Sequence, residues 1–315
     1  MLGLRLGFPD RGNDARDTTT RQAYDLVARG FGPGANGPLL LIAEQPEAMA
    51  GLDARLREHP GVAAVTGPVA SADGRAAMMT VVPASSPQDP RTEQLIHDLR
   101  DAGSGVQVGG ATASFVDQSE ATAARLPLFV GTVIALSFLL LVATFRAPVV
   151  AAKAAVMTLL SIGAAFGMVA LLAEGGWAGQ LIGIDTETPV PPFIPVIMFA
   201  VLFGLSMDYE VFLLSRIREE FLLRRDASQA ITTGLARTAR VITAAALIMV
   251  AVFGAFGFSS QVQLKLIGVG LATAVLVDAT VIRMLLVPAV LQLLGARSWW
   301  LPRRLRAPPA TDPGA

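Results

Sequence analysis

The stretch that decides the fold lies at residues 203–220 and reads FGLSMDYEVFLLSRIREE. With the apolar residues before it, it forms a run from Pro192 to Leu214, and a membrane-spanning helix needs about 20 such residues. Asp208 lies about eight residues, or roughly 12 Å of helix, before the basic segment that begins at Arg216. The pattern therefore predicts a spanning helix that carries a carboxylate inside the hydrocarbon region.

Asp208 is the first candidate for chemistry in this span. An ionised carboxylate in hydrocarbon costs several kcal/mol unless it is paired or reaches water, so such a group can take up and release a proton. That property suits a proton relay, while the alternative is a protonated aspartate that makes a structural hydrogen bond between helices. Tyr209 can donate or accept a hydrogen bond. Glu210 projects about 200° around the helix from Asp208, so we expect it on a different face.

The last apolar run carries a second pair of charged residues, in VLVDATVIRM at residues 275–284. Asp278 and Arg283 are about 7 Å apart along a helix and about 140° apart around it, so we expect each to meet a neighbouring helix. Arg283 can also extend to the interface. For Asp278 a relay role and a structural contact stay open, whereas for Arg283 the structural role is favoured.

Composition places most of the chain in a bilayer. Of 315 residues, 53% are hydrophobic and 16% are charged, which leaves too little polar surface for a soluble globule. Basic and acidic residues balance at 25 each, and the basic ones flank apolar runs, which argues against a nucleic-acid partner. There is no Cys, and neither His59 nor His97 has a second ligand at metal spacing, so we expect no metal and no other cofactor.

Five apolar runs follow Arg125, and each is long enough to span the membrane as a helix. They are Leu126–Phe145, Val149–Leu172, Pro192–Leu214, Val241–Phe258 and Leu266–Leu294. We therefore predict an N-terminal domain at residues 1–120, a transmembrane domain with five helices at 121–295 and a C-terminal tail at 296–315.

The region before Arg125 alternates between strand and helix patterns. After a helix at Thr18–Arg29, the pattern predicts a strand at Leu39–Glu44, a helix at Glu47–Glu58, strands at Val62–Thr66 and Met78–Pro83, a helix at Pro90–Asp101 capped by Asp89, and a strand at Val106–Gly109. The order βαββαβ predicts an α+β, ferredoxin-like domain.

Loop charges predict the orientation. Basic residues flank the first connection, crowd the third connection and follow the last span, whereas the second and fourth connections, residues 173–190 and 259–263, hold no Lys or Arg. The positive-inside rule then places the C-terminus in the cytoplasm and the N-terminal domain outside it. Because nothing visible here would carry that domain across, we interpret the chain as one piece of a longer protein. The basic residues are Arg146, Lys153, Arg216, Arg218, Arg224, Arg225, Arg237, Arg240, Arg297, Arg303, Arg304 and Arg306.

Three further patterns concern packing. Gly163 and Gly167 in GAAFG form a small-xxx-small pair, which is suited to close helix packing. The segment Ile217–Ala236 mixes Arg, Glu and Leu and predicts an amphipathic helix at the cytoplasmic interface. Trp299 and Trp300 predict an interfacial anchor after the last span.

Four stretches resemble one known family. They are AYDLVARGFGPGANGPLL, GLSMDYEVFLLSRIREE, GLARTARVITAAALIMVAVFGAF and LIGVGLATAVLVDATVIRMLLVPA. Together they are similar to the second half of MMPL-family (mycobacterial membrane protein large) transporters, a branch of the resistance-nodulation-division superfamily. The resemblance runs from about Gly3 to Trp300, and the stretch that contains DYE is its specific part.

The resemblance implies two similar halves, each with one helix, an extracytoplasmic porter domain and five further helices. It implies that Asp208 and Tyr209 face a matching pair in the other half and carry protons. Glu210, Asp278 and Arg283 match further residues of the family's relay. The partner pair belongs to the first half, which this chain does not contain.

These observations lead to a functional hypothesis. The chain is expected to export lipids or other hydrophobic molecules across the plasma membrane, driven by the proton gradient, as the C-terminal half or a fragment of an exporter and not as an enzyme. Its expected partners are the substrate, membrane lipids and the first half or a like subunit. Two alternatives stay open: an intramembrane aspartyl protease that uses Asp208 and Asp278, although the GxGD context is missing, and a non-transporting scaffold or remnant.

Overall fold

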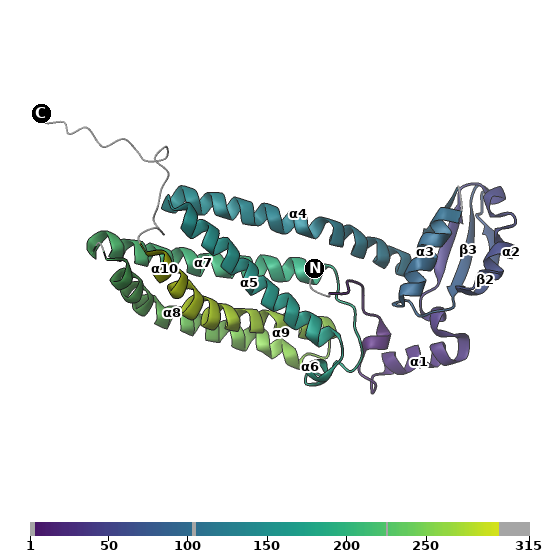
Figure 1. Ribbon diagram of the computed structural model, residues 1–315. Coiled ribbons are helices and arrows are strands. Elements are labelled where there is room, and N and C mark those ends of the chain that lie inside the picture. The colour runs from purple at the N-terminus through teal and green to yellow at the C-terminus, as the bar shows by residue number, and fades with distance from the viewer. Residues whose placement is uncertain (1–3, 103–104, 225, 296–315) are drawn as a thin grey trace, which may run out of the picture.

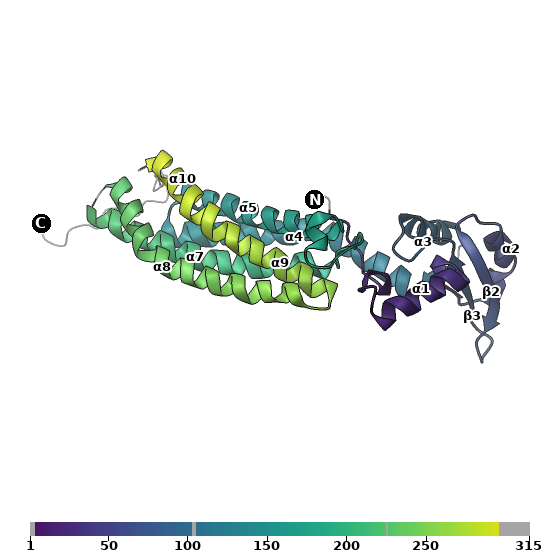
Figure 2. The ribbon, with the colours of Figure 1, turned by 90° about the horizontal axis from the view of Figure 1, so that it is seen from below.

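The computed structural model describes residues 4–102, 105–224 and 226–295. It has two parts, a small sheet domain and a bundle of long helices, which lie end to end (Figures 1 and 2). Helix α4, Ala111–Phe145, runs without a break from one part into the other. The division predicted at residue 120 therefore falls inside a continuous helix. The predicted anchor, Trp299 and Trp300, lies outside the described residues.

The sheet domain has the predicted βαββαβ order. Its elements are β1 (Leu39–Ala43), α2 (Leu52–Arg57), β2 (Val62–Ala70), β3 (Ala77–Pro83), α3 (Pro90–Ala102) and β4 (Val106–Gly109). The strands pair antiparallel in the order β2-β3-β1-β4. Side chains of α2 and α3 join one buried cluster with β1 and β3, so both helices cover the same face of the sheet. This arrangement is ferredoxin-like, and the predicted fold class is confirmed.

The period-two pattern of β1 and β3 explains the core of this domain. In β1, Leu39, Leu41 and Ala43 are at most 1% exposed, and the residues between them face the other side. Met79 and Val81 of β3 are equally buried. Successive strand residues point to opposite faces, so only one face of the sheet needs a cover of helices.

The helix predicted at Glu47–Glu58 is interrupted. It consists of a 3-10 turn, η3 (Pro46–Met49), followed by α2. Gly51 between them has φ 77°, a left-handed conformation that glycine adopts at little cost, so the chain turns there. Before the sheet lie η1 (Arg11–Asn13), α1 (Thr19–Phe31) and η2 (Pro33–Asn36).

All five predicted spans are present as helices that are long and apolar enough to cross a membrane. They are α4, α5 (Pro148–Ala173), α7 (Phe193–Arg224), α8 (Ala227–Ala255) and a last span made of α9 (Val262–Val277), a π-helical segment (Asp278–Leu286) and α10 (Val287–Leu294). Two short helices, α6 (Trp177–Gln180) and η4 (Phe256–Phe258), lie in the connections. The chain is a multi-pass membrane protein.

The predicted interfacial helix at Ile217–Ala236 is wrong. Helix α7 continues straight to Arg224, and α8 begins at Ala227, so the segment forms the two arms of a helical hairpin. The Asp226 side chain accepts hydrogen bonds from the backbone N–H groups of Ser228 and Gln229. This N-cap starts a new helix, because it satisfies donors that the first turn leaves open.

The glycines that allow close packing are not the predicted ones. A Cβ atom built at Gly163 or Gly167 would meet nothing within 4 Å, so the predicted pair packs against no helix in the described chain. At Gly268, by contrast, it would lie 2.6 Å from the Phe253 carbonyl oxygen of α8. At Gly270 it would lie 2.6 Å from Val169 of α5. The last span therefore approaches its neighbours through its own glycines.

Gly268→Ala is expected to destabilise the bundle by about 1–3 kcal/mol, because the added methyl group forces α8 and α9 apart. Gly254→Ala is the matched control, since a Cβ atom there meets nothing within 4 Å. The control should unfold at the same temperature as the parent or slightly higher, because alanine favours helix. Thermal unfolding in detergent micelles measures both variants, and equal losses would contradict the packing role of Gly268.

Candidate functional site

Asp208 lies midway along α7 and points away from the other helices of this chain. Its side chain is exposed, and it makes no hydrogen bond or ion pair with any described residue. Mid-span carboxylates normally face a bundle interior or a water-filled cavity. The outward position of Asp208 therefore differs from the usual position of a carboxylate within a spanning helix.

Tyr209 follows Asp208 but faces the bundle. It is half-buried, and the guanidinium carbon of Arg283 lies 5.2 Å from the centre of its ring. Consecutive helix residues point about 100° apart, so one side chain of the pair lies outside and the next lies inside. A cation over an aromatic face is attracted by the electron-rich ring. Tyr209 thus connects the surface of Asp208 with the charged centre of the bundle.

Asp278 and Arg283 form an ion pair, which corrects the expectation that each meets another helix instead. Arg283 Nε donates to Asp278 Oδ2 at 2.6 Å, and Arg283 is 2% exposed. The reason is the π-helical segment Asp278–Leu286. Its hydrogen bonds join residues five apart, so residues 278 and 283 lie one above the other, as they would not in a regular α-helix. Such π segments are frequent at functional sites.

Two serines that the sequence analysis missed complete this network. Ser161 Oγ of α5 donates to Asp278 Oδ1 at 2.7 Å. Arg283 Nη2 donates to the Ser206 carbonyl oxygen at 2.6 Å and to its Oγ at 3.0 Å. Its Nη1 is buried and has no hydrogen-bond partner within the described ranges. The network therefore joins α5, α7 and the last span, and it keeps one donor open.

Glu210 pairs with Lys153, which the sequence analysis counted among the basic residues that flank the first connection. Lys153 lies inside α5, and its Nζ is 2.7 Å from Glu210 Oε1. The two side chains are 3% and 7% exposed. Glu210 thus lies on a different face from Asp208, as predicted. A lysine within a span, opposite a glutamate in another, was the sequence signal for this pair.

The three acidic residues predicted for the relay differ in their partners. Asp278 pairs with Arg283, and Glu210 pairs with Lys153. Asp208 has no such cation among the residues that the structure describes. An aspartyl dyad requires two carboxylates that share a proton, and here both oxygens of Asp278 are engaged by Ser161 and Arg283. The geometry disfavours the protease alternative.

His97 is not isolated, which corrects the expectation from its sequence spacing. Its Nε2 lies 2.8 Å from Glu120 Oε1, and Glu93 contributes a third ligand atom within 4.8 Å. Glu93 and His97 come from α3 and Glu120 from α4, so the spacing was hidden in the tertiary structure. The two glutamates are exposed.

Comparison with known proteins identifies the relatives of this chain. The sequence profile of the MMPL family matches residues 20–310. Membrane protein YdfJ of Bacillus subtilis is 37% identical over 96% of this chain and 44% of its own length. The mycolic acid-containing lipids exporter MmpL11 of Mycolicibacterium smegmatis is 36% identical over 90% of this chain and 32% of its own. The trehalose monomycolate exporter MmpL3 of Mycobacterium tuberculosis is 41% identical over 64% of this chain and 21% of its own length. The chain spans less than half the length of these relatives.

Lys153→Met leaves the Glu210 carboxylate buried without its cation, so we expect a loss of roughly 3–5 kcal/mol of unfolding free energy. The double variant Lys153→Met/Glu210→Met removes both charges and should recover most of this loss. Denaturant unfolding in micelles measures both.

Arg216→Met serves as the control, because its pair with Glu219 at 2.8 Å is half-exposed and contributes at most about 1 kcal/mol. If the single and double variants at Lys153 and Glu210 lose the same stability, the buried pair does not hold α5 to α7.

Proposed function

The chain belongs to the MMPL family, and from this premise we propose that it is the C-terminal half or a fragment of a proton-driven exporter of lipids or other hydrophobic molecules. Asp208 is the residue that takes up and releases the proton. Tyr209, Glu210, Asp278 and Arg283 set the electrostatics around it. The observation that carries this proposal is an exposed carboxylate at the middle of a spanning helix.

The position of Asp208 supports a second set of helices against this face of α7. An aspartate that faces lipid is costly, whereas one that faces the interior of a larger bundle can reach water or a partner group. A first half with its own polar residues, or a like subunit, would provide that interior. The coverage of the relatives is in keeping with such a partner, since each is more than twice the length of the matched segment.

The inner network supports a mechanism in which protonation changes helix packing. An ionised Asp208 attracts the guanidinium of Arg283, which lies beside Tyr209. A protonated Asp208 is neutral and attracts this cation less strongly. Arg283 Nη1 is an open donor, so α7 can gain a contact in a second arrangement. The proton then biases two packings of α7 against the last span.

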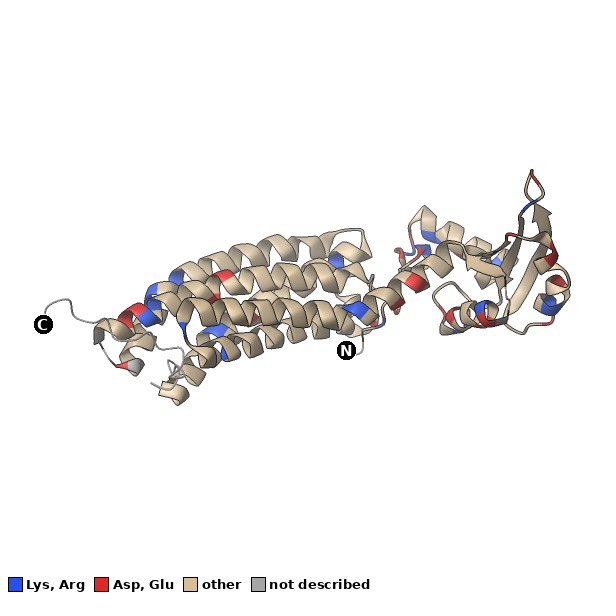
Figure 3. Ribbon diagram, turned by 90° about the horizontal axis from the view of Figure 1, so that it is seen from above, with Lys and Arg blue, Asp and Glu red and all other residues tan. Residues whose placement is uncertain are grey.

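The distribution of charge supports the predicted orientation. Most of the Lys and Arg residues of the bundle lie toward the end that is remote from the sheet domain, as the blue ribbon segments in Figure 3 show. By the positive-inside rule this end is cytoplasmic, and the sheet domain lies outside as a porter domain. The described residues concerned include Arg146, Arg216, Arg218, Arg237 and Arg240.

The names of two relatives support the class of cargo. One is an exporter of mycolic acid-containing lipids, and the other is an exporter of trehalose monomycolate. Both cargoes combine a polar group with long apolar chains. We extend to this chain only the broader class, amphiphilic or hydrophobic molecules that move between the membrane and the porter domain.

Asp208→Asn should abolish proton-driven export, because an amide cannot release a proton at any working pH. The assay joins the chain to the first half of an MMPL transporter in proteoliposomes and follows a fluorescent lipid under an imposed proton gradient. Asp185→Asn, in an exposed outer connection, is the matched control and should export like the parent.

The result also decides between transport and a scaffold. If the joined parent exports and Asp208→Asn does not, Asp208 is the coupling carboxylate. Equal export by both proteins would make Asp208 structural, and no export by any joined protein would favour the non-transporting alternative.

A further inference from the structure

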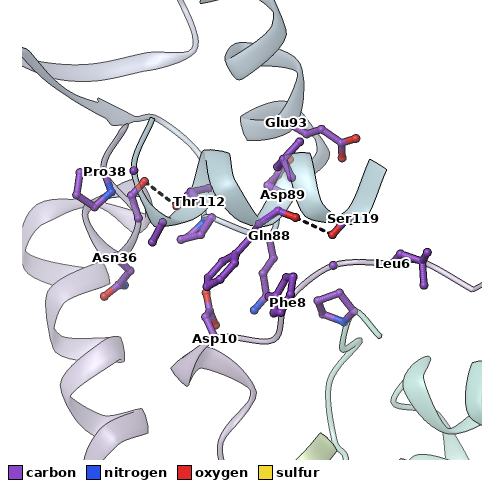
Figure 4. A pocket seen from close by; sticks show the side chains of 18 of the residues that line it. Leu6, Phe8, Asp10, Asn36, Pro38, Gln88, Asp89, Glu93, Thr112 and Ser119 are labelled. Carbon is purple, nitrogen blue, oxygen red and sulfur yellow. Dashed lines mark hydrogen bonds between the residues drawn. The ribbon is translucent and has the colours of Figure 1, made fainter. Parts of the chain in front are cut away.

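A cavity of about 360 Å³ lies where the sheet domain meets the bundle. It is lined by side chains within residues 5–10, 36–40, 87–93 and 110–119, and by Pro189 of the connection before α7. Pockets that bind small ligands usually measure 300–1,000 Å³ and combine apolar walls with a few polar groups. Figure 4 shows Phe8 and Gln88 in the middle of this cavity, with Asp10 on one side and Glu93 on the other.

The apolar wall is built around two stacked rings. Phe8 and Phe115 have their centroids 4.4 Å apart and their planes at 22°. Phe115 is 43% exposed although it lies at the head of a long helix with several buried neighbours. Leu6, Leu40 and Val116 continue the wall. An exposed aromatic surface inside a cavity is a favourable site for an alkyl chain, because burial removes apolar area from water.

The cation of the lining is already engaged. Arg5 Nη1 lies 3.0 Å from Glu187 Oε1, and its Nη2 donates to the Gln88 carbonyl oxygen. Among the lining residues Arg5 is the one Lys or Arg. A negatively charged head group would therefore have to compete with Glu187 for its counter-ion.

The carboxylates of the lining differ in charge state and availability. The hydrogen bond from Arg91 holds the pKa of the Asp89 carboxyl below its usual range, and Arg91 also compensates its charge at 2.7 Å. Burial raises the pKa of the Asp10 carboxyl, which accepts hydrogen bonds from Tyr24 and from the Gly12 backbone. The exposed Glu93 side chain makes no hydrogen bond or ion pair within the part of the chain that the structure describes. Its carboxylate lies within 4.8 Å of the ligand atoms of His97 and Glu120, which do not line the cavity. Among the lining carboxylates, Glu93 is thus the one that no hydrogen bond or ion pair between described residues engages.

We propose that this cavity binds a single-chain amphiphile with a positively charged head group, with its alkyl chain against Phe8 and Phe115 and its head beside Glu93. The volume lies near the lower end of the range for ligand pockets, so we expect a single alkyl chain. Charge complementarity selects the cation, since the free group is a carboxylate and the lining guanidinium is neutralised. The role of this ligand as cargo rests on the proposed function, whereas its binding does not.

The test uses the full chain in phosphatidylcholine nanodiscs without a proton gradient. A dodecyltrimethylammonium probe with a diazirine on its chain is photolysed, and the labelled peptides are mapped by mass spectrometry. Labelling is expected within residues 5–10 and 110–119. Unlabelled dodecyltrimethylammonium should compete at least tenfold better than dodecyl sulfate, with dodecyl maltoside between them.

Two pairs of variants test whether Glu93 binds the head group and whether Phe115 binds the alkyl chain. Glu93→Gln should weaken competition by the cation about tenfold, whereas Glu58→Gln, an exposed glutamate outside the cavity, should not. Phe115→Ala should reduce labelling by every probe, whereas Phe31→Ala, whose side chain is 79% exposed on α1, should leave it unchanged.

Three outcomes would overturn the proposal: equal competition by the three head groups, labelling confined to the spanning helices, or the same labelling in Phe115→Ala. Phe115→Leu keeps an apolar side chain at this position. It therefore shows whether reduced labelling in Phe115→Ala comes from the lost apolar contact or from a folding defect. Asp208→Asn should label like the parent, so a failed transport assay and a failed labelling experiment are separate results.

Discussion

The buried pair between Arg283 and Asp278 is the interaction on which the helix bundle depends. A guanidinium with 2% exposure needs hydrogen-bond acceptors from its surroundings, and it finds them on its own span and on Ser206 of α7. Asp278 in turn holds Ser161 of α5. The last span must therefore lie between α5 and α7 at close range. The bare surfaces of Gly268 and Gly270 make that approach possible.

Within α7, the five residues 206–210 place side chains both in the bundle interior and on its outer surface. Ser206 and Glu210 face the bundle, where they bind Arg283 and Lys153. Asp208 faces outward, and Tyr209 lies between the two directions. Because a helix turns about 100° per residue, neighbouring polar residues cannot share one face. The same short motif thus anchors α7 to the other helices of this chain and leaves a carboxylate on the outer face of the bundle.

The sequence was sufficient for those features that follow from length and period. Five apolar runs predicted five spans, and the order βαββαβ predicted the ferredoxin-like sheet. It was insufficient where the backbone departs from regular geometry. The pairing of Asp278 with Arg283 requires a π-helical turn, and no residue pattern in VLVDATVIRM predicts such a turn. Lys153 was predicted to flank the first connection, near the start of the run Val149–Leu172, and only the fold shows that Glu210 lies opposite it.

The sheet domain is tied to the bundle at two places, and this limits how the two can move. If helix α4 were the only connection, the sheet domain could rotate relative to the bundle about that helix. The second tie is the N-terminal segment, where the backbone N–H of Gly7 donates to the carbonyl oxygen of Val190 at 3.0 Å and the N–H of Val190 donates to that of Arg5 at 2.9 Å. Phe8 stacks on Phe115 of α4 and lies 6.3 Å from Phe193, where α7 begins. In the proposed mechanism, a shift of α7 therefore reaches the sheet domain through direct side-chain and backbone contacts. The cavity beside Phe8 lies on that route, so a ligand bound there would touch the same segment that α7 moves.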